Sequence, residues 1–150
     1  MEKYIGTKVI TAKSMTRGDY NNYRGWTIPE DENPADEGYL VKYEDGYISW
    51  SPKSTFDKAY RAFDGGMSFG SAIELLKMGF KLKRKGWNGK NQYIELAENI
   101  SYKNAGSEII NCDHEAIGNK AIAFVGTSGV QMGWLASQAD MLAEDWIVAK

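Results

Sequence analysis

A tryptophan-rich segment near the C-terminal end of the chain carries the side chains best suited to bind a small planar molecule. Residues 133–146 read GWLASQADMLAEDW, with Trp134 near one end and Trp146 at the other. Between them lie the polar side chains of Ser137, Gln138 and Asp140. A ring in a concave site stacks on a planar heterocycle, while hydroxyl, amide and carboxylate groups fix its orientation. The alternative, which the segment taken alone favours, is that both tryptophans fill an ordinary core around a short helix.

A second segment combines cations with an aromatic ring. Residues 81–90 read KLKRKGWNGK, so that Trp87 and Asn88 follow a run of basic residues. Cations bind phosphate and a ring stacks on a base, which together suit a nucleotide. The alternating pattern of a strand, however, places the lysines on a solvent-exposed face and leaves Arg84 on the apolar side with Leu82. An inward arginine needs an anionic partner, supplied by the protein or by a ligand.

Motifs for catalysis are missing from the sequence. It contains no P-loop, no dinucleotide-binding fingerprint and no supported Ser-His-Asp set. Asp140 with Glu144 or Asp145 could act as an acid and base pair, but neighbouring carboxylates are common in such a composition. Cys112 and His114 form a single Cys-x-His pair, whereas a closed zinc site takes about four ligands. We therefore assign no catalytic residue, no metal and no cofactor.

The composition is that of a folded protein. The 150 residues are 43% hydrophobic and 25% charged, and the formal net charge is -2. This composition excludes an intrinsically disordered chain and gives no basic excess for binding a nucleic acid polymer. No apolar run approaches the about 20 residues that cross a membrane, and the N-terminal residues lack the apolar core of a signal peptide. We expect a protein without membrane contact that stays in the cytoplasm, which suits its single cysteine.

Residues 67–150 are expected to form a ligand-binding domain of the α+β class. Ser68 is a candidate helix N-cap, and apolar residues recur with helical spacing over residues 69–78. Strands are expected at residues 80–84, 93–96, 121–125, 130–132 and 147–148, with the turn GTSG joining the third and fourth. Residues 99–120 are a polar excursion with room for a hairpin of its own. This order predicts a small antiparallel sheet with a helix packed on one face.

Residues 1–63 are expected to form a smaller module of a β-hairpin and a helix, for which the sequence indicates no role. Residues 3–13 alternate loosely and predict a strand, while residues 15–39 have the composition of a loop. The pair Asp45-Gly46 lies between two β-rich runs and predicts a hairpin of residues 39–43 and 47–50. Ser51 before Pro52 predicts the N-cap of a helix that ends at residues 64–66, the boundary between the modules.

Three blocks of the second module resemble the phage-encoded Thoeris anti-defence proteins of the second type. They are the helix block MSFGSAIELLKMGF, the turn RKGWNG and the segment WLASQADMLAEDW, in that order within residues 67–148. The resemblance implies a homo-oligomer, a dimer or a tetramer, that acts as a sponge for cyclic ADP-ribose isomers. A bacterial TIR-domain enzyme makes these signals from NAD. The resemblance also implies binding without cleavage, which starves the effector of the host defence, and some members hold cyclic dinucleotides.

The same resemblance implies roles for individual residues. It implies stacking by Phe69, Trp87 and Trp134, phosphate binding by Arg84, and polar contacts from Asn88, Ser137, Gln138 and Asp140. The excursion at residues 99–120 departs from the family pattern because it is longer than in the compact members. Two other hypotheses stay open. One is an enzyme that acts on a nucleotide, and the other is a phage structural or regulatory module whose tryptophans make only core and oligomer contacts.

Overall fold

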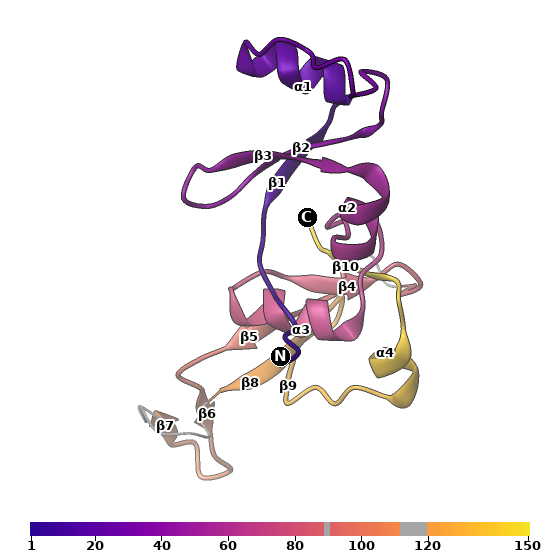
Figure 1. Ribbon diagram of the computed structural model, residues 1–150. Helices are drawn as coiled ribbons and strands as arrows, with labels where there is room; N and C mark the ends of the chain where they lie inside the picture. Colours follow the sequence, from indigo (N-terminus) through magenta and orange to yellow (C-terminus); the bar gives the residue numbers. More distant parts are fainter. Residues whose placement is uncertain (89–90, 112–119) are drawn as a thin grey trace. The chain divides into compact units, whose positions relative to one another are not determined.

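The computed structural model describes residues 1–88, 91–111 and 120–150, and the chain divides into two compact units (Figure 1). Unit 1 comprises Met1–Arg61 and unit 2 comprises Ala62–Lys150. Each unit has its own sheet and its own buried residues, so each is described separately. Within the described residues, none of the helices combines the length and the apolar character that a membrane crossing requires.

Unit 1 is built on a three-stranded antiparallel sheet with two short helices. The strands are β1 (Thr11–Ser14), β2 (Gly38–Lys42) and β3 (Ile48–Pro52), in the order β1-β2-β3. The helices are α1 (Arg17–Arg24) and α2 (Lys53–Ala59). The predicted hairpin is confirmed by β2 and β3. In its turn, Asp45 Oδ1 accepts a hydrogen bond from the Tyr47 N–H at 3.0 Å, and Gly46 has a φ of 87°, which favours glycine.

Two boundaries in unit 1 differ from prediction. The strand expected at residues 3–13 begins only at Thr11, because Thr11 pairs with Lys42 and β2 ends there. The helix α2 is shorter than expected, and Ser51 does not cap it. Ser51 belongs instead to β3, where it pairs with Tyr39, so its backbone is part of the ladder before the helix begins.

The helix α1 lies in a stretch for which the sequence predicted a loop, and this prediction is wrong. The Thr16 side chain caps the helix by accepting a hydrogen bond from the Asp19 N–H at 3.2 Å. Its buried residues include Tyr20 and Asn21 rather than an apolar stripe. The Asn21 amide donates to the Glu32 carboxylate at 2.9 Å. A polar contact with the following loop therefore takes the place of apolar periodicity, and the Thr16 cap is a local signal that the sequence analysis did not use.

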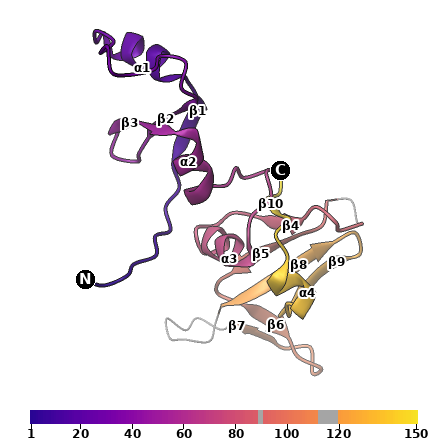
Figure 2. The ribbon, with the colours of Figure 1, turned by 45° about the vertical axis from the view of Figure 1, so that its right-hand side comes forward.

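Unit 2 is an antiparallel sheet of five strands with a helix on one face, which confirms the predicted α+β class (Figures 1 and 2). The strands are β4 (Leu82–Arg84), β5 (Tyr93–Ala97), β8 (Ala121–Gly126), β9 (Gly129–Met132) and β10 (Trp146–Val148). They lie in the sheet in the order β10-β4-β5-β8-β9. The helix α3 (Phe69–Lys77) packs against β4, β5 and β10. Ser68 caps it as predicted, because its Oγ accepts a hydrogen bond from the Ser71 N–H at 3.2 Å.

The core of unit 2 forms where α3 meets the sheet. Its buried side chains are those of Met67, Ala72, Leu75, Leu76, Leu82, Ile94, Ala123 and Trp146. A short helix, α4 (Gln138–Leu142), contacts α3 and leads into β10. A separate hairpin of β6 (Ser101–Lys103) and β7 (Ile109–Asn111) occupies part of the predicted excursion and extends away from the five-stranded sheet (Figures 1 and 2). Cys112 and His114 lie outside the described residues.

Candidate ligand-binding site

Trp87 and Trp134, which the sequence analysis singled out in separate segments, lie in one aromatic cluster. Their ring centroids are 6.2 Å apart and their planes meet at 69°. Phe124 and Trp146 complete the cluster, each with its ring centroid 5.5 Å from that of Trp87. Trp146 is fully buried in the core, whereas the other three rings keep part of their surface exposed. Edge-to-face contacts of this kind stabilise the orientations of the partly exposed rings.

The partly exposed rings line a cleft with a volume of about 290 Å³. Its lining residues are Gly86, Trp87, Asn88, Gln92, Phe124, Trp134 and Asp140. Three rings therefore meet two side-chain amides and one carboxylate. A planar heterocycle that stacks on a ring in this cleft finds hydrogen-bond donors and acceptors next to its edges.

Neighbouring strands bring the lining residues together from distant parts of the chain. Trp87 lies in the turn that follows β4. Gln92 directly precedes β5, and Phe124 lies on β8, the next strand in the sheet. Trp134 follows β9, and its N–H donates a hydrogen bond to the Ile122 carbonyl at 2.9 Å. The chain after β9 thus folds back onto β8 and carries the Trp134 ring to the other rings.

Arg84 is paired with two carboxylates of the protein. Its Nε lies 2.9 Å from Asp145 Oδ1, and its Nη1 lies 3.1 Å from Asp140 Oδ1. The anionic partner that an inward arginine needs is therefore supplied by the chain, and Arg84 is not among the residues that line the cleft. The two ion pairs attach α4 and the segment before β10 to β4. Arg84 thus positions Asp140 at the cleft, and phosphate binding by Arg84 stays a prediction.

The ion pairs keep both carboxylates ionised. Burial raises the pKa of Asp140, but hydrogen bonds from Ser137 and from the Arg84 guanidinium together outweigh it, so the pKa lies below its ordinary value. Burial also raises the pKa of Asp145, and hydrogen bonds from Arg84 and from the Gly86 N–H produce a net lowering. The hydrogen bonds to Asp145 and then to Asp140 raise the pKa of Arg84. At neutral pH, one positive and two negative charges therefore lie beside the cleft.

Besides Arg84, three predicted residues lie outside the cleft lining: Phe69, Ser137 and Gln138. Ser137 and Asp140 form the capping box of α4. Ser137 Oγ accepts a hydrogen bond from the Asp140 N–H at 3.0 Å, and the Ser137 N–H donates to Asp140 Oδ2 at 2.9 Å. Gln138 is the first residue of α4 and is exposed. The Phe69 ring lies 5.5 Å from the buried Trp146 ring. In the described fold, Ser137 therefore shapes the segment that carries Asp140, and Phe69 packs against the core.

Sequence reasoning missed Gly86, Gln92 and Phe124 as lining residues. Phe124 carried a signal, because an aromatic residue in an alternating strand must occupy one face of the sheet, but the pattern did not say which rings lie on that face. Gln92 carried none beyond its position just before a strand. Its place in the cleft depends on the pairing of β5 with β8, which is a tertiary feature.

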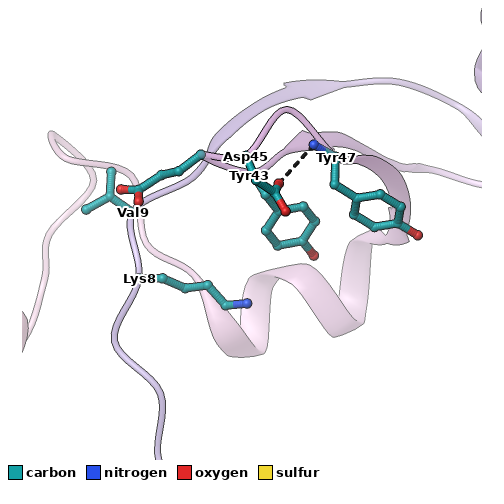
Figure 3. A pocket seen from close by; sticks show the side chains of 6 residues that line it. Lys8, Val9, Tyr43, Asp45 and Tyr47 are labelled. Carbon is teal, nitrogen blue, oxygen red and sulfur yellow. Dashed lines mark hydrogen bonds between the residues drawn. The ribbon is translucent and has the colours of Figure 1, made fainter.

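Unit 1 contains a second hollow, with a volume of about 490 Å³ (Figure 3). Its lining residues are Lys8, Val9, Tyr43, Glu44, Asp45 and Tyr47, from the N-terminal arm and the β2–β3 turn. The centroids of the Tyr43 and Tyr47 rings are 5.7 Å apart, and Lys8 Nζ lies 4.9 Å from the Tyr43 centroid. Asp45 is engaged in the turn through the Tyr47 N–H. Since these contacts hold the arm and the turn together, we assign the hollow to the local structure of unit 1.

By fold and by cleft, unit 2 is a small α+β domain that gathers aromatic rings at one concave site. Residues 67–149 match the family model described as the Thoeris anti-defense 2-like domain. A protein of Bacillus phage SP01 described as Thoeris anti-defense 2 is 40% identical over 85 residues, which are 53% of this chain and 91% of that protein. The chain therefore belongs to the Thoeris anti-defense 2-like family, and its role is phage anti-defence. This confirms the resemblance found in the three sequence blocks.

Proposed function

We propose that unit 2 binds a cyclic ADP-ribose isomer, the immune signal of a TIR-domain enzyme, and withholds it from the host without cleaving it. The observation that carries the proposal is the cleft in which Trp87, Phe124 and Trp134 meet two side-chain amides that have no hydrogen bond within the described part of the chain. The protein acts in the cytoplasm of the infected cell, where such a signal is made. Membership of an anti-defence family supports the same role.

The chemistry of the cleft suits the adenosine part of such a ligand. An adenine ring stacks on the indole or phenyl faces, and each stacked base contributes about 1–3 kcal/mol in comparable sites. Asn88 and Gln92 offer amide donors and acceptors, and neither side chain has a hydrogen bond to another part of the described chain. The ionised Asp140 accepts hydrogen bonds from ribose hydroxyl groups.

We further propose that a second copy of the chain completes the site. The cleft of about 290 Å³ is at the lower limit of volumes that enclose a small ligand, so one copy leaves part of a cyclic nucleotide uncovered. The strand β9 lies at the edge of the described sheet and exposes Val130 and Met132, followed by Leu135 in the next segment. An exposed strand edge with apolar side chains favours pairing with another chain. This edge is next to Trp134, so an oligomer formed there covers the cleft.

Sequestration without cleavage fits the titratable groups of the cleft. Among the described lining residues, Asp140 is the one with a titratable side chain, and its lowered pKa keeps it ionised at neutral pH. An ionised carboxylate cannot act as a general acid, and no second titratable group lines this described part of the cleft to complete a pair. Capture needs affinity rather than turnover, and a nanomolar dissociation constant corresponds to about 12 kcal/mol of binding free energy.

Calorimetry with the full chain and purified cyclic ADP-ribose isomers tests the proposal. We expect tight binding of at least one isomer, and heating should release it unchanged in mass and chromatographic behaviour. Trp134→Ala should weaken binding about 10- to 100-fold while the thermal transition remains. Trp26→Ala is the matched control, because Trp26 is also partly exposed but lies in unit 1.

Each alternative has its own outcome in this experiment. No binding of any isomer rejects the proposal. Release of an altered product identifies an enzyme instead. If Trp134→Ala abolishes folding or assembly rather than ligand binding, the tryptophans serve a structural module.

A further inference from the structure

Gln92 holds an uncrowded position at the wall of the cleft. It directly precedes β5, and the pairing of Tyr93 with Val125 places it opposite Gly126 at the end of β8. Its Nε2 lies 3.9 Å from the point that a Cβ atom would occupy at Gly126. A Cβ atom at that point would be 3.0 Å from Phe124 Cε1, so the Phe124 ring would have to shift to make room for it. Because position 126 is glycine, the Gln92 amide and the Phe124 ring share an open space at this wall.

Gln92 is half-buried, and its side-chain amide has no hydrogen bond to the described residues of the chain. Two fully buried residues have their polar groups paired within the chain: the Asn21 amide donates to Glu32 at 2.9 Å, and Trp146 Nε1 donates to the Asp140 carbonyl at 2.9 Å. Because Gln92 is half-buried, water hydrates its amide only in part in the free protein. A ligand that enters the cleft can supply the missing hydrogen bonds.

The chemistry of the amide selects the kind of partner. A glutamine side chain presents one donor group beside one acceptor, and it binds an adenine edge through the 6-amino group and the neighbouring ring nitrogen. Asp140 offers acceptors alone, so it cannot recognise this edge in the same way. Asn88 is exposed, so water satisfies its amide in the free protein. The rings of Trp87 and Phe124 supply the stacking surface next to Gln92.

We propose that Gln92 is the specificity-determining residue of the cleft and reads the hydrogen-bonding edge of an adenine ring stacked on the aromatic cluster. This inference rests on the proposed function, because it names how the captured nucleotide is recognised. The aromatic rings then provide binding affinity, and the Gln92 amide provides selectivity for the base. A hydrogen-bonding pair of this kind discriminates between bases by about 10- to 100-fold in affinity.

Calorimetry on the full chain, with the tightest-binding cyclic ADP-ribose isomer as probe, tests the inference. Gln92→Ala should weaken binding about 10- to 100-fold and leave the thermal transition unchanged. Asn22→Ala is the control, since Asn22 is an exposed amide residue on α1 in unit 1 and is not among the residues that line the cleft, and it should bind like the unaltered chain. Binding by Gln92→Ala within about twofold of the unaltered chain overturns the inference.

A second measurement separates base recognition from a general loss of shape. The probe is the same isomer with hydrogen in place of the adenine 6-amino group. The unaltered chain should bind it about tenfold or more weakly than the parent isomer, whereas Gln92→Ala should bind the two about equally. If the unaltered chain and Gln92→Ala lose affinity for the analogue by the same factor, the inference is wrong, although the chain still sequesters the isomer. If the unaltered chain binds no isomer, the proposed function fails first, and this inference fails with it.

Discussion

Arg84 and Asp145 form an ion pair of 2.9 Å between Nε and Oδ1 across 61 residues of sequence. Arg84 lies in β4 and Asp145 immediately precedes β10, so the pair joins the two strands that end the sheet on this side. The same guanidinium reaches Asp140 in α4, and the Asp145 carboxylate also accepts a hydrogen bond from the Gly86 N–H at 3.3 Å. One arginine therefore holds both the turn that carries Trp87 and the helix that carries Asp140.

The first prediction concerns the pH dependence of unit 2. The folded pKa values of Asp140 and Asp145 are lowered, so their stabilisation is fully present above the unfolded carboxyl pKa of about 3.9. This stabilisation is lost as the pH falls from about 4 through the lowered pKa values of the two carboxyl groups in the folded protein. Urea denaturation of unit 2 at pH values from about 3 to 7 should show this decline. In Asp145→Asn the decline should be smaller, and its stability should approach that of the unaltered protein at low pH. Parallel curves for the two proteins contradict the prediction.

The second prediction concerns the cap of α4. Ser137→Ala removes the oxygen that accepts the Asp140 N–H, so the free energy of unfolding should fall by about 1 kcal/mol. Ser128→Ala, in the β8–β9 turn, is the control and should change stability by less than about 0.5 kcal/mol. Chemical denaturation measures both. A variant of Ser137 that keeps its stability but loses ligand binding shows instead that the hydroxyl group contacts the ligand.

The third prediction concerns the start of unit 2. Met67 is buried and exchanges two backbone hydrogen bonds with Trp146, of 2.7 and 3.1 Å, and the Phe63 carbonyl accepts from the Val148 N–H at 2.9 Å. A fragment of residues 62–150 should therefore fold and bind the ligand. A fragment of residues 68–150 should be less stable by at least about 2 kcal/mol, since it lacks these bonds and the buried methionine. Thermal melts compare them, and equal stability argues that residues 62–67 contribute nothing.

The fourth prediction concerns assembly. Val130 and Met132 are 63% and 47% exposed on the edge strand β9. Replacing both with lysine should reduce the molar mass in light scattering by at least half and weaken ligand binding, because charge on a strand edge prevents pairing. Ile109→Lys, at an exposed apolar residue of β7, is the control and should leave the mass unchanged. An unchanged mass in the double variant places the oligomer contact elsewhere.

The sequence by itself determined the elements whose signals are local. Ser68 was identified as an N-cap because the hydroxyl and the N–H it accepts from are three residues apart. The Asp45-Gly46 turn was identified because positive φ is required at that point of the chain. The sequence also supplied the family and the α+β class, since both depend on the order of such elements and blocks.

Only the tertiary structure decided which side chains meet. Trp87 and Trp134 were chosen for their type, but the return of the chain after β9 brings their rings to 6.2 Å. Arg84 required an anion, and the fold supplied two carboxylates where the sequence left a ligand equally open. Gln92 reached the cleft through the register of β5 with β8. Contacts of this kind depend on which strands pair and in what register, and residue spacing along one segment carries no information about a partner far along the chain.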